Sequence, residues 1–180
     1  MKHTSTFKIV LTALFAALIC VATMLVQIPI PATGGYANLG DGVILLCAFL
    51  MNPVCAVIAA GAGSMLADVL AGYMSCAIGT LIIKAVVALI GTAIYNRFGR
   101  GQSGKKAVAV MLVASILTEI FMILSYFAYE AVCLGIGMGA VGAIPGNVGQ
   151  GVVGVIIAVV LTPILTRSRE LNNMMEKTRS

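Results

Sequence analysis

Polar side chains recur at helical spacing inside stretches of this sequence that are otherwise apolar. Ser64 and Asp68 are four residues apart, and Glu119, Met122 and Tyr126 follow one another at spacings of three and four. Residues at these spacings lie on one face of an α-helix. Their carboxyl, thioether and phenol groups are suited to binding a small ligand. The candidate ligand contacts are Tyr36, Asn38, Asp68, Lys84, Glu119, Met122, Tyr126, Asn147 and Gln150.

The acids in these stretches outnumber the single basic residue, Lys84. This excess suits a ligand with an amine, a ring-nitrogen donor or a protonated carboxyl, and it fits a polyanion poorly. Structural roles stay open beside the ligand-binding one. Lys84 could pair with Asp68 or Glu119 and join helices, and Asn147 and Gln150 could cross-link helices.

Sequence signatures of catalysis are missing. The chain contains neither H-E-x-x-H nor G-x-S-x-G, its five cysteines include no C-x-x-C, and His3 is its one histidine. We therefore predict no catalytic residue, no metal site and no cofactor. Gly137–Gly142 fits G-x-G-x-x-G, but no strand is predicted before it. Gly99–Lys105 resembles a phosphate-binding loop, yet Lys106 stands where Ser or Thr would hold magnesium. We expect no ATP site in this chain.

The elements that must position these groups follow from the composition. The chain has 180 residues, of which 61% are hydrophobic and 9% charged, whereas a soluble domain has about 25% charged residues. The mean hydropathy is +1.09. These values predict an all-α membrane protein with a single domain over residues 1–180, because a spanning helix needs ~20 apolar residues. The predicted spans are 7–28, 42–52, 54–72, 77–96, 107–130 and 145–166, followed by a tail at 167–180.

The basic residues predict the topology. Ten of the eleven lie before or at the start of the first span, between the fourth and fifth spans, or after the last one. Since cytoplasmic loops hold Lys and Arg, an even number of crossings must separate Lys8 from Arg97. The short stretch 42–52 is therefore a span of its own, separated by Pro53 from the next. We predict six transmembrane helices with cytoplasmic N- and C-termini. The formal net charge of +5 follows from this distribution of basic residues in the predicted cytoplasmic segments. We therefore expect no nucleic-acid partner.

This topology places the polar groups between mid-membrane and the outer surface. Lys84 falls in the outer half, Glu119 falls near mid-depth, and Glu130 is expected at the interface, where water solvates it. Ionisable groups at membrane depth usually face a bundle interior or a wet cavity. The pattern predicts a pocket that opens to the exterior and is closed below.

Small residues recur at every fourth position in two helices, and such faces let helices approach closely. Gly63, Ala67 and Ala71 form one in the third span, where internal packing is expected. Ala13 and Ala17 form another in the cytoplasmic half of the first span, where a partner could dock.

Four segments of the chain combine glycines with polar residues in a fixed order. They are Tyr36-Ala-Asn38-Leu-Gly40-Asp41-Gly42-Val, the run from Gly61 to Tyr73, the stretch Glu119-Ile-Phe-Met122 to Glu130, and Pro145-Gly146-Asn147-Val-Gly-Gln150-Gly151. Together they resemble the substrate-binding S components of energy-coupling factor (ECF) transporters. Their order and spacing extend over residues 10–166. The sequence is similar to the riboflavin-type group, which includes carriers of hydroxymethylpyrimidine and vitamin B6 forms.

The resemblance implies a six-helix bundle in a prokaryotic plasma membrane that binds a vitamin or vitamin precursor from outside. It also implies a membrane coupling subunit, docked at Ala13 and Ala17, and two cytoplasmic ATPases. The 29–41 loop matches the lid over the pocket. The alternative is a stand-alone secondary transporter with Glu119 and Lys84 as a proton relay. No matching motifs between the two halves of the chain support the internal repeat common in such transporters.

Overall fold

The structure, a computed structural model, describes residues 2–168, with side chains from residue 6 onward. The predicted tail at 167–180 therefore lies outside the described residues from position 169. The elements are α1 (Lys2–Leu25), β1 (Gln27–Ile30), β2 (Gly35–Asn38), α2 (Gly40–Leu50), α3 (Pro53–Ala71), α4 (Met74–Ile94), η1 (Tyr95–Gly99), α5 (Gly104–Ala128), η2 (Tyr129–Cys133), η3 (Gly137–Ala143) and α6 (Ile144–Arg167).

The prediction of an all-α membrane protein is confirmed. Within the described residues, five helices are long and apolar enough to cross a membrane, and the sixth, α2, has only 11 residues. The predicted break after α2 is also present. Asn52 caps α3 by accepting a hydrogen bond from the Cys55 amide at 2.9 Å, and Pro53 occupies the first turn, where its missing N–H costs nothing.

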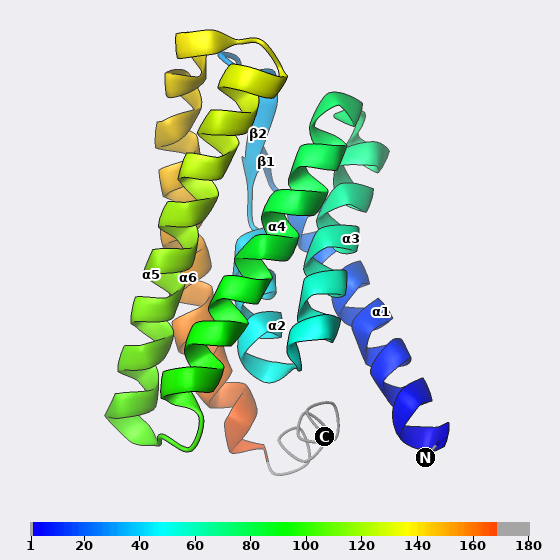
Figure 1. The fold of residues 1–180 in the computed structure, drawn as a ribbon, viewed down its shortest axis with the longest axis vertical. Helices are drawn as coiled ribbons and strands as arrows, with labels where there is room; N and C mark the ends of the chain where they lie inside the picture. Colours follow the sequence, from blue (N-terminus) through cyan, green and yellow to red (C-terminus); the bar gives the residue numbers. More distant parts are fainter. Residues whose placement is uncertain (1, 169–180) are drawn as a thin grey trace.

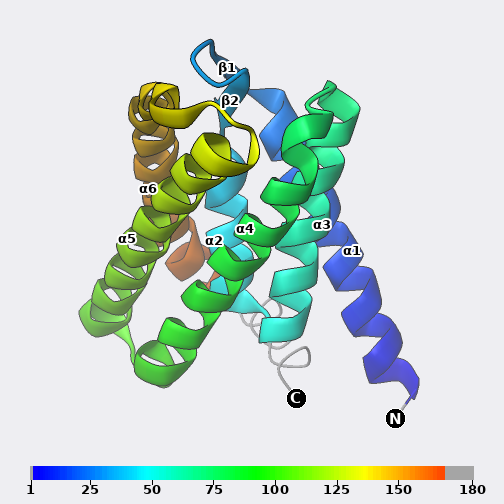
Figure 2. The ribbon, with the colours of Figure 1, turned by 45° about the horizontal axis from the view of Figure 1, so that its top comes forward.

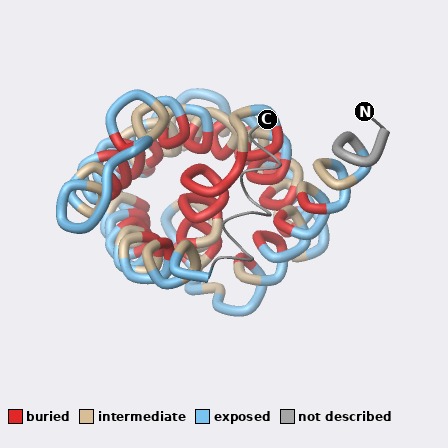
Figure 3. The backbone as a smooth tube through the Cα atoms, turned by 90° about the horizontal axis from the view of Figure 1, so that it is seen from below, coloured by how far each residue is buried: buried red, intermediate tan, exposed pale blue. Residues whose placement is uncertain are grey.

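The short helix α2 forms the centre of the bundle. It contacts α1, α3, α4 and α6, while α3, α4, α5 and α6 surround it in chain order (Figures 1 and 2). Buried segments face the interior and exposed ones face outward (Figure 3). Ile44 of α2, Val87 of α4 and Met122 of α5 are all 0% exposed. The all-round apolarity of α2 thus reflects burial on every side.

Helices α1 and α3 approach closely at Gly63. A Cβ atom there would lie 2.5 Å from the carbonyl oxygen of Ala16. This distance is too short for a van der Waals contact, so only glycine fits without a shift of the backbone. Ala67 is also fully buried. The small-residue face predicted in the third span is therefore an internal packing surface.

The loop predicted at 29–41 is a β-hairpin. Its two strands pair antiparallel, with Gln27 opposite Asn38 and Ile30 opposite Gly35, and Gly34 turns the chain with φ +67°. Because Gln27 begins β1, helix α1 ends at Leu25 rather than at 28. The hairpin lies at one end of the bundle, while the start of α1, the α4–α5 connection and the end of α6 lie at the other (Figure 1). Apart from Lys84, the basic residues with described side chains belong to the segments at that second end: Lys8, Arg97, Arg100, Lys105, Lys106 and Arg167.

Candidate functional site

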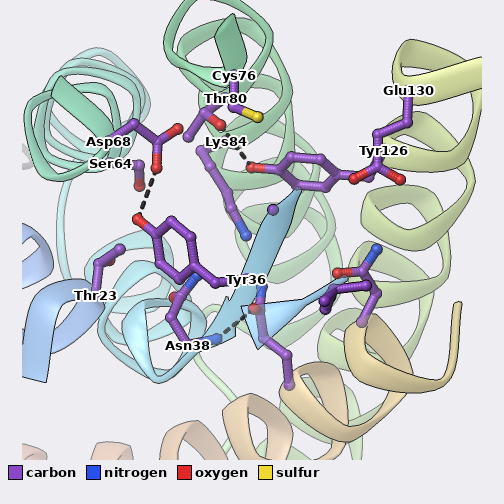
Figure 4. Close-up of a pocket in the computed structure, with 14 residues that line it drawn as sticks. Thr23, Tyr36, Asn38, Ser64, Asp68, Cys76, Thr80, Lys84, Tyr126 and Glu130 are labelled. Atoms are coloured by element: carbon purple, nitrogen blue, oxygen red, sulfur yellow. Dashed lines mark hydrogen bonds between the residues drawn. The ribbon is translucent and has the colours of Figure 1, made fainter. Parts of the chain in front are cut away.

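A polar cavity lies beneath the hairpin and is lined by every α-helix except α2 (Figure 4). As it stands, the centres of water-sized molecules can occupy about 30 Å³ of it, which suffices for a few waters. A larger guest requires the hairpin or side chains to move. The lining residues are Thr23, Ile30, Gly35, Tyr36, Asn38, Ser64, Asp68, Cys76, Thr80, Lys84, Tyr126, Glu130, Asn147 and Gln150.

Most of the predicted ligand contacts meet in this cavity. The seven that line it are Tyr36, Asn38, Asp68, Lys84, Tyr126, Asn147 and Gln150. Glu119 and Met122 do not line it. They share a face of α5 with Tyr126. Met122 lies one turn below Tyr126 and packs into the apolar core, and Glu119 lies two turns below it, against Gly151 of α6. Ligand contact by these two residues stays a prediction from the sequence.

Lys84 is held from below by Asp41, a residue in the first turn of α2. The Lys84 Nζ lies 2.5 Å from Asp41 Oδ1, and both side chains are at most 2% exposed. Asp41 Oδ2 accepts a hydrogen bond from Gln150 Nε2 at 2.6 Å. Lys84 therefore forms its ion pair with Asp41, and neither suggested partner, Asp68 or Glu119, lies within ion-pair distance of it.

The same network fixes the base of the hairpin. The backbone N–H of Asn38 donates to Gln150 Oε1 at 2.7 Å, and Asn38 Oδ1 accepts from the Gly40 N–H at 2.8 Å. Gln150 thus links the hairpin to the buried Lys84–Asp41 pair. The sequence suggested that Gln150 either contacts the ligand or cross-links helices. In the structure it lines the cavity and also joins the hairpin, α2 and α6.

Tyr36 closes the cavity from the hairpin side. Its hydroxyl donates to Asp68 Oδ1 at 2.6 Å (Figure 4), and its ring centroid lies 4.5 Å from that of Tyr73. Burial, together with the neighbouring Asp68 carboxylate, raises the pKa of the Tyr36 phenol. The phenol is therefore a neutral donor, and Asp68 accepts from it.

Tyr126 forms the opposite wall. Its hydroxyl donates to Thr80 Oγ1 at 3.0 Å, and the Lys84 ammonium lies 5.2 Å from its ring centroid, within the range of a cation–π interaction. Cys76, Thr80 and Lys84 are spaced by four residues on α4 and all line the cavity. This spacing alone could have added Cys76 and Thr80 to the candidate residues.

The sequence-based placement of Glu130 is wrong. Its side chain is not solvated: it is 5% exposed and lines the cavity. Glu130 belongs to η2, which continues α5 at the hairpin end of the bundle. Its position four residues after Tyr126 was the available signal. Ser64, four residues before Asp68, lines the cavity in the same way.

The small-residue face of α1 is exposed, as a docking surface requires. Ala13 and Ala17 are both exposed, and Ala13 lies in a shallow apolar groove between α1 and α3 with Ile9 and Ile58. This groove is on the outer surface of the bundle, away from the polar cavity.

Comparisons with known proteins identify the fold and the family. A solved structure reported as the S component of a bacterial ECF transporter superposes with a TM-score of 0.67 at 22% identity, over 91% of this chain and 97% of that one. An uncharacterised protein of Pyrococcus woesei is 40% identical over 139 residues, or 77% of this chain and 88% of its own length. The family model of the ECF-type riboflavin transporter S component matches residues 3–167. The chain therefore belongs to this family of multi-pass membrane transport subunits.

Proposed function

We propose that this chain captures a vitamin or vitamin precursor in the cavity beneath the hairpin and passes it on through a coupling complex. The candidate substrates are pyridoxine, pyridoxamine, hydroxymethylpyrimidine and riboflavin-like compounds. The observation that carries the proposal is the convergence of seven independently predicted polar residues on one cavity at the hairpin end. Family membership supports a substrate-binding subunit over an enzyme.

The proposed orientation puts the hairpin end outside a prokaryotic plasma membrane. It is supported by the clustering of Lys8, Arg97, Arg100, Lys105 and Arg167 at the other end of the bundle, since cytoplasmic loops are enriched in basic residues. The proposed partners are a membrane coupling subunit, which contacts the exposed Ala13 and Ala17 face, and two cytoplasmic ATPases that supply the energy.

The test measures uptake of labelled candidate substrates by cells that express this chain with and without the coupling subunit and ATPases. We expect uptake to require ATPases that hydrolyse ATP. Native mass spectrometry of the purified chain should reveal a bound small molecule. Uptake that persists without the ATPases and collapses with the proton gradient would instead establish the secondary transporter. Among the described residues Lys84 forms its ion pair with Asp41 rather than with Glu119.

A further inference from the structure

The charges that line the cavity do not cancel. Lys84, Asp68 and Glu130 are its charged lining residues, and the positive charge of Lys84 is already matched by Asp41, which lies outside the lining. Asp68 and Glu130 therefore form no ion pair with a cation among the described residues. The cavity lining thus holds two carboxyl groups and one ammonium, which is itself paired.

The acceptor atoms of these two acids are also unmatched. Asp68 is 4% and Glu130 5% exposed. Asp68 Oδ2 and Glu130 Oε2 have no hydrogen-bond partner among the described residues, although the Thr80 hydroxyl lies beside Asp68 and the Thr33 hydroxyl lies beside Glu130. Ser64, which is 1% exposed and also lines the cavity, has an unpartnered hydroxyl. Buried polar groups are rarely left unpaired, so these atoms point to a guest that supplies donors.

The remaining walls favour a flat, positively polarised guest. Tyr36 and Tyr126 present aromatic rings on opposite sides of the cavity (Figure 4), and aromatic faces attract cations. An anionic guest would find only Lys84, whose ammonium is held by Asp41. We propose that the ligand of this cavity is a small aromatic nitrogen base with a protonated amine, bound through the carboxylates of Asp68 and Glu130.

This inference rests on the proposed function, because it assumes that the cavity is the substrate site. Its test uses two probes that differ in one group: pyridoxamine carries a protonated aminomethyl group where pyridoxine carries a hydroxymethyl group. Calorimetry on the full chain in detergent at pH 7 should give at least about tenfold tighter binding of pyridoxamine, as a charge-assisted hydrogen bond implies.

Asp68→Asn and Glu130→Gln keep the side-chain shape and remove the charge. In each variant we expect the preference for pyridoxamine to fall by about tenfold. Because the readout is a ratio of two affinities for the same variant, a partial loss of folded protein cancels. Ser115→Ala is the control, since it changes a buried polar residue of α5 that does not line the cavity. It should leave the ratio unchanged.

The outcomes separate this inference from the proposed function. Equal affinity for the two probes, a preference that survives both substitutions, or no binding of pyridoxamine would each overturn the cationic ligand. Tight binding of riboflavin with ATPase-dependent uptake would overturn it too, while leaving the transport function intact. A co-purified compound without a basic nitrogen would likewise overturn the cationic ligand and leave the transport function standing.

Discussion

The buried pair between Lys84 and Asp41 allows a quantitative test of how this bundle is held together. The two side chains are 2% and 1% exposed, and the Gln150 amide also donates a hydrogen bond to the Asp41 carboxylate. In Lys84→Met the carboxylate stays buried and loses its counter-charge. Removing one partner of a buried pair costs about 3–5 kcal/mol, and we expect Lys84→Met to lower the free energy of unfolding by this amount.

Neutralising both partners should restore most of that loss. In the double variant Lys84→Met with Asp41→Asn, no uncompensated charge is buried, and replacing a buried pair by neutral groups is often nearly neutral. We expect the double variant to lie within about 1–2 kcal/mol of the parent. Each single variant should lie well below both.

The assay is reversible unfolding by sodium dodecyl sulfate in mixed micelles, followed by far-ultraviolet circular dichroism. Lys105→Met is the matched control, because Lys105 is an exposed lysine at the start of α5, and its substitution should change the free energy by less than about 0.5 kcal/mol. The reasoning is refuted if Lys84→Met costs under about 1 kcal/mol. It is equally refuted if the losses of the two single variants simply add in the double variant.

Three further predictions address the hairpin, the α1–α3 contact and the docking face. Tyr36→Phe removes the hydroxyl that donates a hydrogen bond to the buried Asp68 carboxylate. Backbone amides of the hairpin should then exchange faster in deuterium-exchange mass spectrometry, and unchanged rates would contradict a role of this hydrogen bond in holding the hairpin. Gly63→Ala should destabilise the fold by about 1–3 kcal/mol through overpacking, as measured by thermal denaturation. Its control is Gly149→Ala, where no atom lies within 4 Å of the added Cβ, and this variant should be neutral or stabilising. Ala13→Leu should weaken co-purification with the coupling subunit without changing ligand affinity; Ala93→Leu, at an exposed alanine of α4, is its control, and an equal effect of both would reject a specific face.

Helical periodicity located part of the cavity lining but not its depth. The spacing of Ser64 and Asp68, and of Asn147 and Gln150, correctly placed each pair on one face that meets the others in space. On α5 the same reasoning groups Glu119 and Met122 with Tyr126, and of these three residues Tyr126 lines the cavity. A period of 3.6 residues defines which face of a helix turns inward, but not where along that face a cavity ends and a packed core begins.

Helical periodicity could not identify the ion-pair partner of Lys84. Asp41 is 43 positions away in the chain and was expected in an external loop. It instead begins α2, which lies inside the bundle with every residue from Gly40 to Gly42 buried. No local pattern predicts contacts at this separation, since they depend on how whole helices pack.

The sequence by itself determined that this chain is a helical membrane protein, where its spans break, and which faces carry polar groups. These properties depend on local hydrophobicity and backbone chemistry, to which each residue contributes almost independently of distant ones. The tertiary structure decided which charges neutralise one another. Because α2 brings Asp41 to Lys84, Asp68 and Glu130 remain unmatched beneath the hairpin, and that long-range pairing sets the chemistry of the ligand we propose.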